Sequence, residues 1–157
     1  MDVLIRKGVK SDLPAVLDLI KELADFERAL IEVTVSLEDL EHDGFGNHPY
    51  YWFIVAEKEG EIIGLSFYFI RYSTWKGRFL FLEDFVVKES FRNKGVGALL
   101  FEETIRIAKE LDVKGMTWQV LDWNKNAIRF YEKYNSDIST EWYNGKLTYE
   151  QLKQFTL

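Results

Sequence analysis

The sequence Arg92-Asn93-Lys94-Gly95-Val96-Gly97-Ala98 lies between an apolar stretch, residues 79–87, and a stretch with apolar residues at helical spacing. This order predicts a strand, a glycine-rich turn and a helix. The N-terminus of a helix presents unpaired N–H groups and a partial positive charge, and glycines let the backbone approach an anion closely. With Arg92 and Lys94 adding charge, the segment is typical of a loop that binds phosphate.

Two common phosphate loops do not fit this segment. A Walker loop would end in Gly-Lys-Ser or Gly-Lys-Thr, whereas this chain has Gly97-Ala98-Leu99. A dinucleotide-binding loop would need a third small residue where Leu100 stands. A helix start with two packing glycines is the simpler alternative, and the long strand before the loop favours phosphate binding over it.

The remaining chain shows strand and helix patterns along its whole length, without repeats or linkers. We therefore expect one domain, residues 1–157, with a mixed α/β sheet. Strands are predicted at residues 3–6, 51–57, 61–71, 79–87 and 116–121. Helices are predicted at residues 12–28, with Ser11 as N-cap, from residue 36 onward, from the glycine loop to about residue 111, and at residues 126–134. A loop is predicted at residues 43–49. The tail, residues 142–157, is predicted to hold a last strand and a turn of helix.

Composition excludes several classes of protein. The formal net charge of -6 disfavours binding to nucleic acid, whose partners are more often basic. The chain has no cysteine, which excludes disulfides, thiolate metal sites and a cysteine nucleophile. It shows no signal-peptide pattern and no apolar run of about 20 residues. We expect a soluble, cytoplasmic protein that does not bind membranes.

Five segments outside the glycine loop, taken in order and at their spacings, resemble one branch of a known superfamily. They are Lys21-Glu22-Leu23-Ala24-Asp25-Phe26-Glu27, Asp43-Gly44-Phe45-Gly46-Asn47-His48-Pro49, Leu82-Glu83-Asp84-Phe85-Val86-Val87, Leu121-Asp122-Trp123-Asn124 and Ala127-Ile128-Arg129-Phe130-Tyr131. Together with Arg-x-x-Gly-x-Gly they resemble the GCN5-related N-acetyltransferases (GNAT), in particular the spermidine/spermine N1-acetyltransferases and the thialysine N-acetyltransferases. The resemblance implies a mostly antiparallel central sheet with splayed strands, flanked by helices, and a homodimer.

The resemblance also implies acetyl-CoA as the co-substrate and assigns residues to it. The residues implied are the backbone of Phe85, Val86 and Val87 for the pantetheine arm, the loop Arg92, Asn93, Lys94, Gly95, Val96, Gly97 and Ala98 for the phosphates, and Asn124 and Tyr131 on the following segments. Direct attack of an amine on the thioester needs no metal. A metal site built on His42 and His48 is set aside, because no carboxylate-rich motif joins them.

Two catalytic residues follow from the same resemblance. An alkyl ammonium has a pKa of about 10.4, so freeing its lone pair at neutral pH costs about 4 to 5 kcal/mol. Glu83 matches the base that acts through a water molecule, and Tyr131 matches the acid that protonates the thiolate. Asp84 would attract the ammonium. Adjacent residues of a regular strand face opposite sides, so only one of Glu83 and Asp84 is expected to face the substrate.

The amine site is assigned to acids and aromatic residues. Its expected members are Phe26, Glu27, Trp75, Glu83, Asp84, Glu141 and Trp142. The polyamine branch has Asp-Pro-Trp where this chain has Ser73-Thr74-Trp75, and loss of that acid favours a lysine-like amino acid, ornithine or a short diamine over spermidine. A protein or peptide acetyltransferase, and a non-catalytic module that binds CoA or polyamines, are the alternatives.

Overall fold

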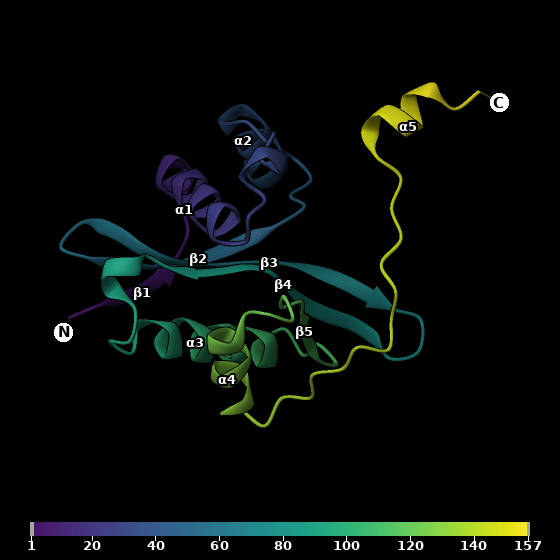
Figure 1. Cartoon of the computed structure of the whole chain (residues 1–157). Helices are drawn as coiled ribbons and strands as arrows, with labels where there is room; N and C mark the ends of the chain where they lie inside the picture. The colour runs from purple at the N-terminus through teal and green to yellow at the C-terminus, as the bar shows by residue number, and fades with distance from the viewer. Residues whose placement is uncertain (1, 157) are drawn as a thin grey trace. The chain divides into compact units, whose positions relative to one another are not determined.

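A five-stranded sheet of order β1-β2-β3-β4-β5 forms the first of two units in the computed structural model, which describes residues 2–156 (Figure 1). The strands are β1 (Leu4–Lys7), β2 (Trp52–Lys58), β3 (Glu61–Ser73), β4 (Gly77–Val87) and β5 (Met116–Trp118). The first four pair antiparallel and β4 pairs parallel with β5. The predicted mixed, mostly antiparallel sheet is confirmed.

Helices cover both faces of this sheet. They are α1 (Leu13–Phe26), α2 (Leu37–Phe45) and α3 (Val96–Glu110), with short 3₁₀ turns η1 (Lys10–Asp12), η2 (Leu30–Glu32) and η3 (Glu89–Phe91). The helices α1 and α2 lie on one face and α3 lies on the other (Figure 1). On the α1 side Leu13 and Val16 pack in one core cluster with Leu65, and on the α3 side Leu100 packs with Ile63. The apolar spacing of each helix therefore forms one of two cores separated by the sheet.

Two helix boundaries differ from the predictions. Ser11 lies inside η1, and the residue at the N-cap of α1 is Asp12. The carboxylate of Asp12 accepts hydrogen bonds from Arg6 Nη1, at 2.7 Å, and from the backbone N–H of Val9, at 2.9 Å. The helix α2 continues to Phe45, so the loop predicted at residues 43–49 begins three residues later, at Gly46. The helix α2 starts with a capping box, in which Ser36 Oγ accepts from the N–H of Asp39.

The strand β4 contains a bulge at Glu83. Phe67 of β3 pairs with Asp84, and the next residue, Tyr68, pairs with Leu82, so Glu83 has no opposite residue in the β3–β4 register. Asp84 shares a face with Phe67, which packs in the core cluster on the α1 side. Leu82, paired with Tyr68, lies on the opposite face. Residues two apart normally share a face, and the extra residue breaks that alternation.

The two strands β4 and β5 separate at the same point. Their pairing covers Leu80, Phe81 and Leu82 of β4, opposite Met116, Thr117 and Trp118 of β5. In the described part of the chain, residues 84–87 of β4 pair with β3, and residues 83–87 have no partner on β5. β5 thus ends at Trp118, three residues before the predicted end, and the predicted splay is confirmed.

Residues 122–156 form the second unit. They contain α4 (Lys125–Glu132) and α5 (Tyr149–Gln154). The prediction of a last strand in the tail is wrong, because no residue from 142 to 156 is in a strand; α5, begun by a Thr148 capping box, is the predicted helical turn. The prediction of a single domain over residues 1–157 stays a prediction. Within residues 2–156 no helix combines the length and the apolar character that a membrane span requires.

Candidate active site

The glycine loop leads into a helix whose first turn has no side-chain cap. Gly95 is the N-cap of α3, with φ of 85°, and no side-chain hydrogen bond caps this end. A Cβ added at Gly95 would have nothing within 4 Å, so the space beside the cap is open. Asn93, at φ of 59°, also has a left-handed backbone. The N–H groups of the first turn, at Val96, Gly97 and Ala98, can therefore take an anion as their partner.

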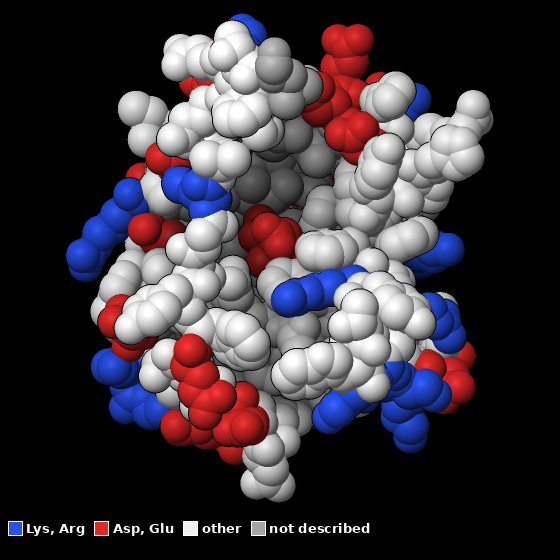
Figure 2. Space-filling view, turned by 90° about the vertical axis from the view of Figure 1, so that its right-hand side faces the viewer, with Lys and Arg blue, Asp and Glu red and all other residues white. Residues whose placement is uncertain are grey.

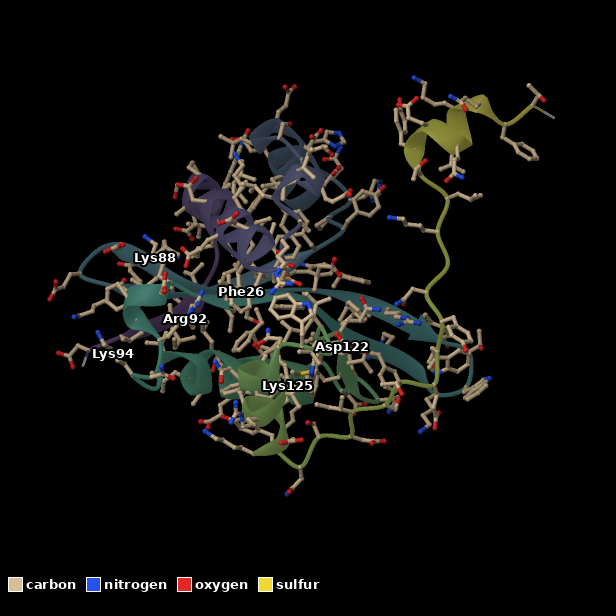
Figure 3. All side chains as sticks on the ribbon, in the orientation of Figure 1. Phe26, Lys88, Arg92, Lys94, Asp122 and Lys125 are labelled. Carbon is tan, nitrogen blue, oxygen red and sulfur yellow. The ribbon has the colours of Figure 1, made fainter. Side chains whose placement is uncertain are left out.

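The two basic residues of this loop are held by protein groups. Arg92 Nε donates to the carbonyl oxygen of Val87 at 2.9 Å, and Arg92 Nη2 lies 3.5 Å from Glu22 Oε1. Lys94 Nζ donates to the carbonyl oxygen of Ser90 at 2.9 Å. Figure 3 shows Lys88, Arg92 and Lys94 on the segment that leaves β4. These contacts keep positive charge beside the uncapped end of α3.

Three carboxyl groups gather on the α1 side of the sheet, next to the bulge. Burial and the neighbouring charges of Glu83 and Glu27 raise the pKa of Asp84 to about 7. Burial and the charge of Glu83 also raise the pKa of Glu27, which follows the last residue of α1. Sequence analysis expected Glu83 and Asp84 on opposite faces; that expectation is wrong, because the bulge turns Asp84 to the face where Glu83 and Glu27 act on it. We call these three residues the acidic group.

The segment of β4 that follows the acidic group runs along the splay. Val86 is buried in the α1-side core, whereas Phe85 and Val87 pack on the α3 side. Their side chains are thus occupied on both faces. The backbone edge of residues 83–87 that faces away from β3 is the edge that β5 does not pair with, and Phe85, Val86 and Val87, which the sequence assigns to the pantetheine arm, lie along it.

In the second unit, Asn124 lies directly before α4 and Tyr131 lies within that helix. Asn124 Oδ1 caps α4 by accepting from the N–H of Ala127 at 3.2 Å, which leaves its amide nitrogen as the group that can donate to a ligand. Tyr131 is buried, with 6% of its surface exposed. Its ring contacts that of Phe130, with centroids 5.4 Å apart. The unit holds the Tyr131 ring in a defined position.

Trp75, an expected member of the amine site, lies apart from the acidic group within the first unit. Trp75 is 85% exposed in the turn between β3 and β4. From Gly77 to Glu83 the strand advances by about 20 Å, at about 3.3 Å per residue. Glu141 and Trp142 lie in the tail of the second unit, where both are exposed. Phe26, the last residue of α1, and Glu27, its C-cap, belong to the first unit together with Glu83 and Asp84.

Sequence reasoning missed Glu22. Its Oε1 accepts the backbone N–H of Glu89 at 3.1 Å, which joins α1 to η3. Glu22 stands four residues before Phe26, so the two share one face of α1, but no local pattern of the sequence indicated the contact with η3.

The surface carries charges of both signs. On the face drawn in Figure 2, basic and acidic side chains of the described residues are interspersed, and one group of acidic side chains lies recessed near its centre. This face, as far as it is described, has no broad basic surface of the kind that nucleic-acid binding requires. Within residues 2–156 no group of three or more His, Asp or Glu side chains is arranged to hold a metal ion.

Comparison with known proteins agrees with this arrangement. Residues 16–135 match the model of the acetyltransferase (GNAT) family. The chain is 37% identical to the thialysine N-epsilon-acetyltransferase of Bos taurus over 147 residues, which are 88% of this chain and 86% of that protein. It is 32% identical to the human spermidine/spermine N(1)-acetyltransferase-like protein 1, over 94% of this chain and 23% of that protein.

Among solved structures, an integron cassette protein from the mobile metagenome of V. cholerae superposes with a TM-score of 0.78, at 21% identity, over 98% of this chain and 97% of that one. That likeness concerns the fold. The family model covers most of the chain and the thialysine relative is 37% identical over 88% of it: the chain belongs to the acetyltransferase (GNAT) family.

Proposed function

We propose that this amine N-acetyltransferase moves the acetyl group of acetyl-CoA directly onto a primary amine of a small cationic metabolite. The observation that supports this most is the acidic group, three carboxyls on one face beside the point where β4 leaves β5. A cation is the ligand that such a group attracts. The same point of the sheet begins the backbone edge of β4 that β5 does not pair with, which suits the donor arm.

The donor is proposed to bind along this edge and at the glycine loop. Acetyl-CoA is the co-substrate of GNAT acetyltransferases. Its pantetheine would pair with the backbone of residues 85–87, and its pyrophosphate would accept from the first N–H groups of α3. Asn124 would hydrogen-bond the arm. A backbone N–H of β4 would stabilise the negative charge that develops on the acetyl oxygen.

Proton transfer in this proposal uses two residues. Glu83 removes the proton of the ammonium through a water molecule, Asp84 and Glu27 add the negative potential that holds the cation, and the freed nitrogen attacks the thioester carbon. The carbon–sulfur bond then breaks, Tyr131 gives its proton to the thiolate of CoA, and the second proton that the nitrogen loses in forming the amide passes to solvent, from which Tyr131 is protonated again. No covalent bond to the enzyme forms in this direct transfer.

The favoured substrates are lysine-like amino acids, with thialysine and ornithine before spermidine or spermine. Support comes from Ser73-Thr74-Trp75, which lacks an acid, and from the thialysine acetyltransferases among the relatives. The test is release of free CoA from acetyl-CoA with a panel of thialysine, ornithine, lysine, putrescine, spermidine, spermine and a lysine peptide. Turnover confined to the peptide would indicate a protein acetyltransferase, and donor binding without any turnover would indicate a binding module.

The base is tested with Glu83→Gln. Activity at neutral pH should fall by about 10²-fold or more, and part of it should return as the pH approaches the amine pKa, where free amine no longer needs a base. Glu59→Gln, an exposed acid in the turn between β2 and β3, is the control and should keep the wild-type profile. A Glu83→Gln profile parallel to the wild type would remove Glu83 from this role.

We also propose a cytoplasmic homodimer. Several apolar side chains of the second unit are exposed in the single chain, among them Trp142 at 80% and Phe155 at 71%. Exposed apolar segments of this kind are typical of an interface. Light scattering during size-exclusion chromatography should give twice the 18.6 kDa of one chain, and a monomer would contradict the proposal.

A further inference from the structure

One face of α1 contacts the segment that leads into the glycine loop. Glu22 Oε1 accepts the N–H of Glu89 at 3.1 Å and lies 3.5 Å from Arg92 Nη2. One turn further, the ring of Phe26 lies under the guanidinium of Arg92, with its centroid 5.6 Å from Arg92 Cζ (Figure 3). An anionic partner and an aromatic partner therefore hold the same guanidinium from a single helix.

Arg92 is also fixed from the sheet. Its Nε donates to the carbonyl oxygen of Val87, the last residue of β4. The planar fork of an arginine can serve several partners at once without losing its orientation. Arg92, the first residue of the glycine loop, thus connects that loop to the end of β4 and to α1.

The same turn of α1 reaches the acidic group. Glu27 directly follows Phe26, and the charge of Glu83 acts on it. Residues one turn apart on a helix move together, because backbone hydrogen bonds hold them, as the bond from the Glu27 N–H to the Leu23 oxygen does here. A contact that holds Glu22 and Phe26 therefore also holds Glu27.

We propose that Glu22 is a positioning residue that, through Arg92 and the end of α1, makes binding of the donor strengthen binding of the amine. The inference rests on the proposed function of the glycine loop as the donor site. A pyrophosphate at the loop pairs with Arg92 and holds its guanidinium against Glu22 and Phe26, so the end of α1, and with it Glu27, is held in place for the ammonium. Glu22 keeps Arg92 and the end of α1 in the positions in which donor binding can strengthen amine binding.

The charge of Glu22 can be removed without removing its shape. Glu22→Gln can still accept the N–H of Glu89 but no longer pairs with Arg92. Glu61→Gln is the matched control: Glu61 lines the same open hollow as Glu22 and η3, but its partner is Lys88, at 2.6 Å. Both variants lose one negative charge in the same region, and only the first loses the link to Arg92.

The experiment measures by titration calorimetry how tightly the best amine of the panel binds the full chain, with and without saturating CoA. CoA serves as the donor probe because it cannot transfer an acetyl group. In the wild type and in Glu61→Gln the amine should bind about fivefold or more tightly with CoA present, and the ratio should fall to about one in Glu22→Gln. In turnover with saturating acetyl-CoA, the amine KM of Glu22→Gln should be raised and its kcat should stay within about twofold of wild type.

Other outcomes separate this inference from the proposed function. Equal ratios in Glu22→Gln and wild type, or a wild-type ratio of one, would overturn the inference while the acetyltransferase activity stands. A wild type that binds no CoA would overturn the proposed donor site and the inference with it. If Glu22→Gln fails to fold, Arg92→Lys keeps the charge and loses the fork, and retention of the coupling in that variant would also overturn the inference.

Discussion

Replacing Asp84 with asparagine should make the protein more stable at alkaline pH, although Asp84 belongs to the proposed amine site. Its carboxyl is largely buried beside Glu27 and Glu83, and these surroundings raise its pKa from 3.8 to about 7. The folded protein therefore holds a proton that the unfolded chain releases. The stability that this proton contributes is complete below about pH 4 and is lost as the pH rises through about 7.

The size of the effect follows from the pKa difference. At about 1.4 kcal/mol per pKa unit, ionisation of Asp84 costs the folded state about 4 kcal/mol in full, and about 2 to 3 kcal/mol of this falls between pH 5 and pH 8. These free energies are upper bounds, because water that enters the site stabilises the carboxylate and because the ionisation of each of the three carboxyls depends on the other two. Asparagine keeps the shape of the side chain and carries no charge at either pH.

Urea unfolding at pH 5 and pH 8 measures the difference. The stability of Asp84→Asn relative to wild type should increase by at least about 1 kcal/mol from the lower to the higher pH. Asp25→Asn, which changes an exposed acid on the surface of α1 two residues from Glu27, is the control and should show no such increase. A pH-independent difference between Asp84→Asn and wild type would refute the argument that the acidic group strains the folded state.

Three further changes test the site and its frame. Tyr131→Phe should lower turnover by about 10²-fold or more while CoA affinity changes little; near-normal turnover would exclude Tyr131 as the acid. Gly95→Ala should cost about 1 kcal/mol, because alanine at φ of 85° is strained although its Cβ has open space, and a raised melting temperature would contradict this. Arg6→Met should cost about 3 kcal/mol in urea unfolding, since it leaves the buried Asp12 carboxylate without its charged partner and with only the Val9 N–H. The presence of Arg6 lowers the pKa of Asp12, so this loss should shrink as the pH falls below about 4, and a constant loss would point to packing alone.

Local patterns were sufficient for the elements and for the donor loop. The apolar spacing of Leu13 and Val16 predicted α1, and that of Val96 and Leu100 predicted α3, because a helix that covers a sheet must bury one face. The glycine loop was predicted in place because its conformation depends on its own residues: Gly95 has the positive φ that glycine accepts.

Other features depend on partners far away in the chain. The apolar tail around Trp142 looked like a strand, but a strand exists only where another strand pairs with it, and residues 142–156 have no such partner in the described chain. Trp75 was predicted to line the amine site, but the length of the β3–β4 hairpin separates it from Glu83. The link from Glu22 to Arg92 crosses 70 positions of sequence, which no local pattern reports.

By itself the sequence determined the α/β class, the order of strands and helices, the phosphate loop before α3, and through resemblance the family. Only the tertiary structure decided that Glu83 and Asp84 share a face, because the bulge arises from the register of β4 against β3 and not from the residues of β4 alone. It also brought Glu27 to both of them. The pKa of a carboxyl depends on burial and on nearby charges, so the acidity of this group is a property of the folded chain.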